Sequence, residues 1–343
     1  MLALASSVHA QCGSGTPDAK VTGSGSSFTA VKGSSTIYTG SDYRLAIQTA
    51  IDSISSGQRV VISASGSIGA STLTIGAGKI FEGCGTINAA SKSGRGAIEA
   101  TDVSGVQIPY LTMTGNPYFG LRFSGTKDLV LGKINLNFSG GLGIRFDRDK
   151  AANSNVKMDA IACTGTGSHC VETWNINGLT INSVVAKNVG ECGLLLQKTT
   201  NANVKLVDGE NVATGNGYAT LRFANQNGKL NGGYSTNVRV EKVKARGGGR
   251  GIFCVSESGG AEIGSVDLAN LGNNAILIEN CYGVKINGGT VSNSGEVRIS
   301  ARTEFANTKD VSITLTVNGD VRESPCADNS TWKLSGSGSR NVC

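Results

Sequence analysis

Apolar and polar residues alternate along this chain in short segments that recur at a nearly regular spacing. The segment His169-Cys-Val-Glu-Thr-Trp174 shows the pattern: as one strand, it directs Val171 and Thr173 to one side and Glu172 and Trp174 to the other. Segments of the same kind lie at 120–123, 143–147, 193–198, 220–223, 251–253, 274–278 and 297–299. We expect the stacked segments to form one outward-facing column, made of Arg122, Arg145, Glu172, Leu195 and Arg222.

A second type of strand alternates with the first. Its segments begin at residues 106, 129, 156, 179, 204, 238, 262, 284 and 311, most of them directly after Asn, Gly or Asp. A spacing in the twenties, with short strands and Gly/Asn turns in every period, indicates a solenoid. The Leu/Asn consensus of leucine-rich repeats is missing, as are the Trp-Asp blades of a propeller; a β-sandwich is a further competing interpretation. We therefore predict an all-β parallel β-helix, with rungs over about 59–317.

The two ends and one long interval depart from the repeat. Residues 41–54 predict a helix, with Ser41 as its N-cap, that covers the N-terminal end of the coil. Its apolar face would consist of Leu45, Ala46, Ile51 and Ile54. The Ser- and Gly-rich stretch 11–40 is expected to be an irregular cover, and 318–343 is expected to cover the other end. The long interval predicts an insertion at 226–236 that forms the wall of a cleft. No linker is apparent, so 11–343 is expected to be a single domain.

Composition fits this fold and excludes some functions. Glycine is 49 of the 343 residues but proline only 4, which favours many strands and turns over a disordered chain. The net charge of +6 is spread along the chain without basic runs, so nucleic acid is not an expected partner and an acidic substrate is mildly favoured. No stretch approaches the roughly 18 apolar residues of a membrane span. We expect a monomer without a membrane partner.

Residues 1–10 resemble the end of a secretory signal, with small residues before a cut after Ala10. A secreted, extracellular protein can form disulfides, and this chain has nine cysteines. Cys326 and Cys343 could staple the tail, and Cys170 and Cys192 could bridge adjacent turns; the pairing stays open. The odd cysteine would be Cys12 or a buried core cysteine. Glycosylation sequons occur at Asn137 and Asn329.

Two motifs carry a resemblance to a known family. Gly85-Thr-Ile-Asn88 and Thr112-Met-Thr-Gly-Asn-Pro-Tyr118 resemble rung motifs of the pectin-lyase-like superfamily, and within it of polygalacturonase-type glycoside hydrolases. The resemblance covers roughly residues 80 to 320. It implies a right-handed parallel β-helix that acts on a pectin-like polysaccharide.

The chain departs from that family at its catalytic positions. It has Ser139-Gly-Gly-Leu142 where the family has Asn-Thr-Asp, and Gly167-Ser-His-Cys170 where the family has Gly-Asp-Asp-Cys. It has Glu191-Cys-Gly193 in place of Gly-His-Gly, and Leu221-Arg-Phe223 in place of Arg-Ile-Lys. Inverting hydrolysis needs two carboxyl groups about 6.5–9.5 Å apart. Because the family's aspartates are missing, its mechanism does not transfer to this chain.

The outward side chains offer a different chemistry, β-elimination on a uronate polymer. In this hypothesis Arg145 and Arg222 neutralise the sugar carboxylate, and His169, Lys198 or an arginine removes the adjacent proton. Tyr218 would protonate the leaving oxygen. His169 is the only histidine beyond the presumed signal, although a histidine that merely satisfies a turn is the simpler interpretation. We predict a polysaccharide lyase.

Three other functions remain open. The first is a glycoside hydrolase with rearranged roles, in which Asp147, Asp149 and Glu172 would supply the carboxylates. The same side chains could also hold Ca²⁺. No metal motif is recognisable, so no cofactor is predicted. Arg122, Trp174 and Asp149 are expected to bind substrate, with Trp174 stacking on a sugar. The arginines could instead simply pair with Asp147 and Glu172. A non-catalytic glycan-binding protein and an epimerase complete the alternatives.

Overall fold

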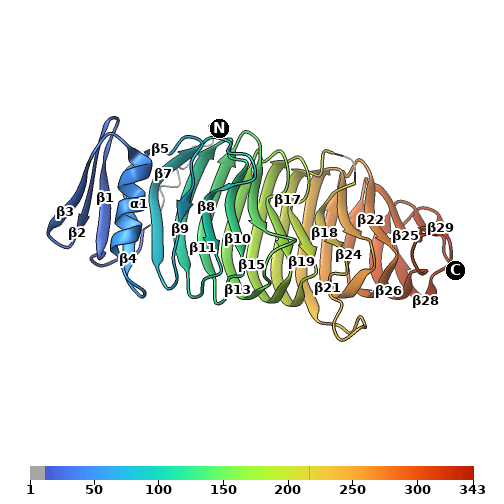
Figure 1. The fold of residues 1–343 in the computed structure, drawn as a ribbon. Coiled ribbons are helices and arrows are strands. Elements are labelled where there is room, and N and C mark those ends of the chain that lie inside the picture. Colours follow the sequence, from blue (N-terminus) through green and yellow to red (C-terminus); the bar gives the residue numbers. More distant parts are fainter. Residues whose placement is uncertain (1–11, 216) are drawn as a thin grey trace, which may run out of the picture.

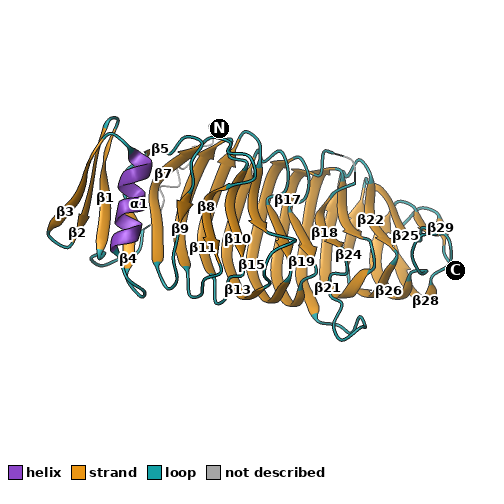
Figure 2. Cartoon of the chain, viewed as in Figure 1, coloured by secondary structure: helices purple, strands orange, loops and turns teal. Residues whose placement is uncertain are grey.

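The computed structural model describes residues 12–215 and 217–343, which form a right-handed parallel β-helix (Figure 1). Strands make up nearly all of the regular structure, and α1 is the one helix in the described chain (Figure 2). Two ladders of parallel strands, sheets A and B, run the length of the coil. The predicted fold class is therefore confirmed. The presumed signal at 1–10 lies outside the described residues.

Sheet B contains the first strand type, and every strand pairs in parallel with the next. Its strands are β6 (Leu73–Thr74), β8 (Gly96–Thr101), β10 (Phe119–Ser124), β12 (Leu142–Phe146), β14 (Val171–Trp174), β16 (Leu194–Gln197), β18 (Ala219–Ala224), β20 (Arg250–Cys254), β22 (Asn274–Glu279), β25 (Gly295–Ser300), β27 (Val321–Glu323) and β29 (Arg340–Asn341). Alternate residues point inward and stack: the rings of Phe123 and Phe146 lie 5.3 Å apart in the core. His169 and Cys170 precede β14 rather than belonging to it.

Sheet A contains the second strand type. Its parallel strands are β4 (Arg59–Ile62), β5 (Gly66–Ser67), β7 (Ile80–Ala89), β9 (Gln107–Gly115), β11 (Val130–Phe138), β13 (Asn153–Thr164), β15 (Ile176–Val189), β17 (Thr200–Val212), β19 (Val238–Gly248), β21 (Ser258–Ala269), β23 (Cys281–Ile286), β24 (Gly289–Ser292), β26 (Lys309–Asn318) and β28 (Asp328–Ser335). Two expected strand starts differ from the observed register: Val238 pairs with Ala202 rather than Val204, and with Ala261 rather than Glu262. Inward positions recur every second residue, so a shift of two leaves the apolar pattern unchanged.

The N-terminal end is more regular than expected. The stretch expected as an irregular cover forms three antiparallel strands, β1 (Ala19–Ser24), β2 (Ser27–Lys32) and β3 (Ser35–Gly40), and β1 also pairs in parallel with β4. These strands form because Val21, Phe28 and Ala30 bury one face of an alternating pattern. They therefore extend sheet A beyond the first rung.

Helix α1 (Tyr43–Ser53) covers the corresponding end of sheet B. The side chain of Gln48 bonds both backbone groups of Thr74 in β6, at 2.9 and 3.0 Å, and so satisfies a strand edge that would otherwise be open. Asp42 is the N-cap rather than Ser41, since its carboxylate accepts from the Leu45 N–H at 2.8 Å. Leu45 is 43% exposed, so it does not belong to the buried face; Ile47 does.

The tail expected as a cover instead continues both ladders, with β28 on sheet A and β27 and β29 on sheet B. The disulfide Cys326–Cys343 staples this last rung, as the sequence suggested. None of the described residues forms a helix with the length and apolarity that crossing a lipid bilayer requires.

The other cysteines pair differently from the expectation. Cys170 bonds Cys163 rather than Cys192, and Cys12 bonds Cys84. A further bridge joins Cys254 and Cys281. The free thiol is the buried Cys192, so the alternative of a leftover core cysteine is correct and that of Cys12 is wrong.

Candidate active site

The outward column of sheet B exists as expected. Arg122, Arg145, Glu172, Leu195 and Arg222 occupy the same register position on β10, β12, β14, β16 and β18. Glu99 on β8 precedes the column and Phe253 on β20 continues it.

The first half of the column is a chain of ion pairs. Arg122 binds Asp147 at 2.7 Å and Glu99 at 3.3 Å. Arg145 binds Glu172 and lies 3.5 Å from Asp147. Burial opposes ionisation of Glu99, but hydrogen bonds from Arg95, the Gly96 N–H and Arg122 outweigh it and hold its pKa below the usual range.

Glu172 is held from several sides. In addition to Arg145, its Oε1 accepts from the Trp174 indole N–H at 3.0 Å and from the Gln197 amide at 2.8 Å. Trp174 is only 6% exposed, and the guanidinium of Arg148 lies 5.7 Å from its ring centroid. The expectation that Trp174 offers a face for sugar stacking is therefore wrong, because its ring is covered and its N–H orients Glu172.

A groove of about 590 Å³ crosses the turns that lead into the strands of sheet B. Tyr118 and Phe119 form an aromatic wall, and Arg145 and Glu172 reach it from the column. The remaining polar lining includes Ser91, Asn116, Ser168, His169, Glu191 and Tyr218. The groove thus combines one arginine, two carboxylates, a histidine and two tyrosines.

Glu191 is the centre of this lining, and the sequence did not identify it as a functional residue. Its Oε2 lies 3.1 Å from His169 Nε2, and it also accepts hydrogen bonds from the hydroxyl groups of Ser168 and Tyr218. The sequence signal that could have found it is its place in the slot where the resembling family has Gly-His-Gly. These donors fix the orientation of the carboxylate in the groove.

His169 is a neutral imidazole that donates a hydrogen bond to the Glu191 carboxylate. The Cys192 backbone N–H donates to its Nδ1 at 3.0 Å, which places the ring proton on Nε2, facing Glu191. Burial lowers its pKa, and the carboxylates of Glu172 and Glu191 offset this only in part. Because the lone pair on Nδ1 is already engaged, His169 is poorly placed to act as the base that the sequence suggested.

Tyr218 and Arg222 flank the carboxylate. The hydrogen bond to Glu191, helped by burial, raises the pKa of Tyr218, so its hydroxyl group keeps its proton at neutral pH. The guanidinium of Arg222 lies 5.6 Å from the Tyr218 ring centroid and 5.1 Å from that of Phe253. Its buried Nε lacks a hydrogen-bond partner, and no carboxylate of residues 12–215 or 217–343 lies within ion-pair distance. Arg222 therefore keeps an uncompensated positive charge beside the groove.

Other expected site residues lie elsewhere. Lys198 is exposed on the turn after β16 and does not line the groove. The Asp149 side chain is 77% exposed and pairs with Arg148. The structure therefore separates both from the remaining candidates.

The described chain brings three potential metal ligands within reach of one another only at Cys12, Glu82 and Cys84, and there the two cysteines form a disulfide. Asp147 and Glu172 are oriented by arginines. Burial raises the pKa of the Cys192 thiol to about 12, so that group stays protonated and unreactive.

No protein-family model matches the chain, and no curated protein sequence matches it significantly. Two solved structures match the chain in the structural comparison. The A-module of mannuronan C-5 epimerase AlgE4 from Azotobacter vinelandii superposes with a TM-score of 0.62 at 14% identity, covering 88% of this chain and 94% of that one. A family 28 exopolygalacturonase from Yersinia enterocolitica gives a TM-score of 0.37 at 12% identity, covering 92% and 82%. The first likeness agrees with the right-handed β-helix described above.

Proposed function

We propose that this protein is a carbohydrate-active enzyme that cleaves a uronate-containing polysaccharide by β-elimination, a polysaccharide lyase. The observation that carries the proposal is the convergence of Tyr218, His169 and Ser168 on Glu191, in a groove flanked by Arg145 and Arg222. The likeness in fold to an enzyme named for mannuronan, a uronate polymer, supports this substrate class.

The arginines have different roles in this mechanism. Arg222 pairs with no carboxylate among the residues that the structure describes, so it binds the carboxylate of the sugar unit that reacts. Arg145, which is partly satisfied by Glu172, adds a second positive charge at the groove. Neutralising the sugar carboxylate acidifies the neighbouring C5–H bond, because the charge left by the proton spreads into an enolate.

The proton transfers use Glu191 and Tyr218. Glu191 takes the proton from C5, a C4=C5 double bond forms, and the C4–O bond breaks. The Tyr218 hydroxyl group gives its proton to the departing oxygen. The hydrogen bond between the two residues then returns the proton from Glu191 to the Tyr218 oxygen, which restores both groups. His169 stays neutral and holds Glu191 in place.

The first test is a screen of the purified chain against polygalacturonate, alginate and neutral polysaccharides, in which 235 nm absorbance and reducing ends are followed together. A lyase produces both signals. Reducing ends without absorbance would exclude β-elimination and establish hydrolysis. Binding without either signal would establish a non-catalytic glycan-binding protein.

Hydrolysis is the second candidate because Glu172 and Glu191 line the same groove. Asp147 and Asp149 are less suitable carboxylates for hydrolysis, since Asp147 binds two arginines and Asp149 lies on an exposed turn. Glu172→Gln would abolish hydrolysis in that case.

Epimerisation at C5 begins with the same proton abstraction as elimination. The same incubation in D₂O separates the two reactions, since an epimerase places deuterium at C5 without forming unsaturated ends. Such a result would keep Glu191 as the base but reject Tyr218 as the acid toward a leaving group.

A further inference from the structure

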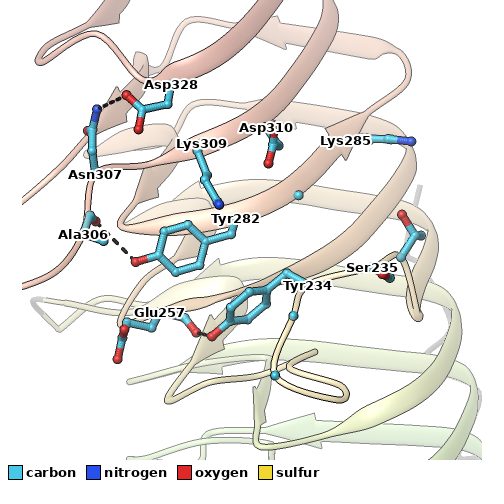
Figure 3. A pocket seen from close by; sticks show the side chains of 14 residues that line it. Tyr234, Ser235, Glu257, Tyr282, Lys285, Ala306, Asn307, Lys309, Asp310 and Asp328 are labelled. Carbon is cyan, nitrogen blue, oxygen red and sulfur yellow. Dashed lines mark hydrogen bonds between the residues drawn. The ribbon is translucent and has the colours of Figure 1, made fainter.

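A second cavity, of about 740 Å³, is lined by the inserted segment before β19 and by residues of β23, β26 and β28 in sheet A (Figure 3). The cavity is lined by strands of sheet A and the segments that lead into them, whereas the groove is lined by strands of sheet B and the turns that lead into them. The two linings share no residue. The inserted segment between β18 and β19 forms one wall, as the long interval predicted. We call this cavity the insertion pocket; its wall comes from residues 232–236.

The inserted segment is bonded to the neighbouring rungs, since the Gly228 N–H donates to the Thr199 carbonyl group at 2.9 Å and the Asn237 N–H to that of Gly260 at 3.0 Å, and it is also braced internally. Leu230 and Gly233 exchange two backbone hydrogen bonds, at 2.9 and 3.0 Å. The amide of Asn237 donates to the carbonyl groups of Gly228 and Ser235, both at 2.8 Å. The pocket is therefore preformed, which lowers the entropic cost of filling it.

Two tyrosines provide an aromatic surface. The rings of Tyr234 and Tyr282 lie 5.0 Å apart at an interplanar angle of 53°. Their hydroxyl groups donate to backbone carbonyl groups, Tyr234 to Glu257 and Tyr282 to Ala306, as the dashed lines in Figure 3 show. Because these polar tips are engaged, the half-buried Tyr234 turns an apolar ring surface toward the cavity, the kind of surface that packs against a sugar ring.

The charged lining mixes donors and acceptors. Lys309 and Lys285 are exposed, and the ion pairs of the described chain include neither. Figure 3 shows the Lys309 ammonium group turned toward Tyr282, while Lys285 extends away. Asp310 and Asp328 supply carboxylate oxygens that can accept from hydroxyl groups. A lining of this kind suits a ligand unit that offers both hydroxyl groups and a carboxylate.

We propose that the insertion pocket is a second, non-catalytic binding site for an oligosaccharide of the uronate polymer. Tyr234 packs against a sugar ring, Lys309 binds its carboxylate, and Asp310 and Asp328 accept from its hydroxyl groups. The cavity volume lies within the range of about 300–1,000 Å³ that small-molecule sites occupy. The identification of the sugar as a uronate rests on the proposed function. The existence of a binding site rests on the geometry of the insertion pocket alone.

The test measures binding of the full chain to immobilised hexagalacturonate and hexamannuronate. The background is the triple variant Arg145→Ala/Glu191→Gln/Arg222→Ala, which removes the proposed base and both arginines that flank the groove. We expect this background to bind one of the two sugars and Tyr234→Ala or Lys309→Ala within it to weaken binding by about tenfold or more. Tyr234→Phe, which keeps the ring, and Lys20→Ala, at the far end of the coil, should bind like the background.

The proposal is overturned if the background variant binds neither hexasaccharide, or if Lys309→Ala binds as tightly as the background. Lys309 is exposed, so its replacement tests the pocket even if Tyr234→Ala does not fold. Binding that depends on Tyr234 and Lys309, together with a wild-type chain that leaves both polymers intact, would uphold the pocket and reject only the proposed lyase activity.

Discussion

His169 and Glu191 face each other across 3.1 Å, with the single ring proton of the imidazole between them. Because the Cys192 N–H occupies the other ring nitrogen, this histidine is a donor to the carboxylate and not a free base. Its role is to position Glu191, and this assignment has a measurable consequence.

Replacing His169 by Gln keeps a donor near Glu191 but loosens its orientation. We expect kcat to fall by roughly 10–100-fold, the cost of a misplaced catalytic group, without a change in the shape of the pH–rate profile. If His169 were the base, the variant would be inactive and the profile would lose its acid limb. The measurement is the rate of 235 nm absorbance from pH 5 to 9.

The lowered pKa of His169 also makes stability depend on pH. In the unfolded chain the imidazole takes up a proton near pH 6.5, while the buried native imidazole resists protonation until lower pH. The unfolded state therefore binds more protons in that window, and native stability falls as pH falls from about 6.5 toward the lowered pKa. We expect the difference in Tm between wild type and His169→Gln to shrink over this range; a constant difference would contradict the lowered pKa.

Arg222 and Arg122 form a matched pair, one without and one with carboxylate partners. Arg222→Ala should lower kcat/KM by roughly 10²-fold, because the charge that stabilises the enolate is lost, with little effect on Tm. Arg122→Ala should mainly lower Tm, because it leaves Glu99 and Asp147 without the guanidinium group that they share. Its effect on kcat/KM should be smaller than that of Arg222→Ala. Equal effects of the two variants on rate would refute the special role of Arg222.

The fold and the column follow from alternation. Inward positions such as Leu121, Ile144 and Leu194 must be apolar to fill the core of the coil. Their alternation with polar residues therefore predicts where the strands lie and which face of each strand is buried. Alternation also fixes which side of β14 carries Glu172. It does not fix register to better than two residues, and for this reason the pairing of Ala202 with Val238 was missed.

The centre of the groove was harder to predict, since it is built from turns. Glu191, Ser168 and Tyr218 precede three different strands, and only the stacking of rungs brings them together. Turn residues do not follow the apolar–polar alternation, so only the spacing of the rungs and the family slot that Glu191 occupies mark them in the sequence. The same reason explains the missed Cys163–Cys170 bridge, which crosses from a strand of sheet A to the following turn.

In the proposed reaction, arginine side chains rather than a metal ion neutralise the sugar carboxylate. The activity should therefore not depend on a divalent cation. The oxygen atoms of Asp147 and Glu172 bind guanidinium groups, and Asp149 lies on an exposed turn. We expect activity to survive chelation and added Ca²⁺ to leave the rate unchanged. Loss of activity in EDTA that Ca²⁺ restores would contradict this assignment of charge. Asp149→Asn is the companion variant, expected to match wild type.

The most direct measurement is the initial rate of 235 nm absorbance on the preferred uronate polymer for wild type, Tyr218→Phe and Glu191→Gln. Each variant removes one proton-transfer group while nearly preserving side-chain shape. We expect both rates to fall by roughly 10²–10⁴-fold, with substrate binding and Tm close to those of wild type. Wild-type rates in either variant would contradict the central claim that Glu191 and Tyr218 carry the protons of β-elimination.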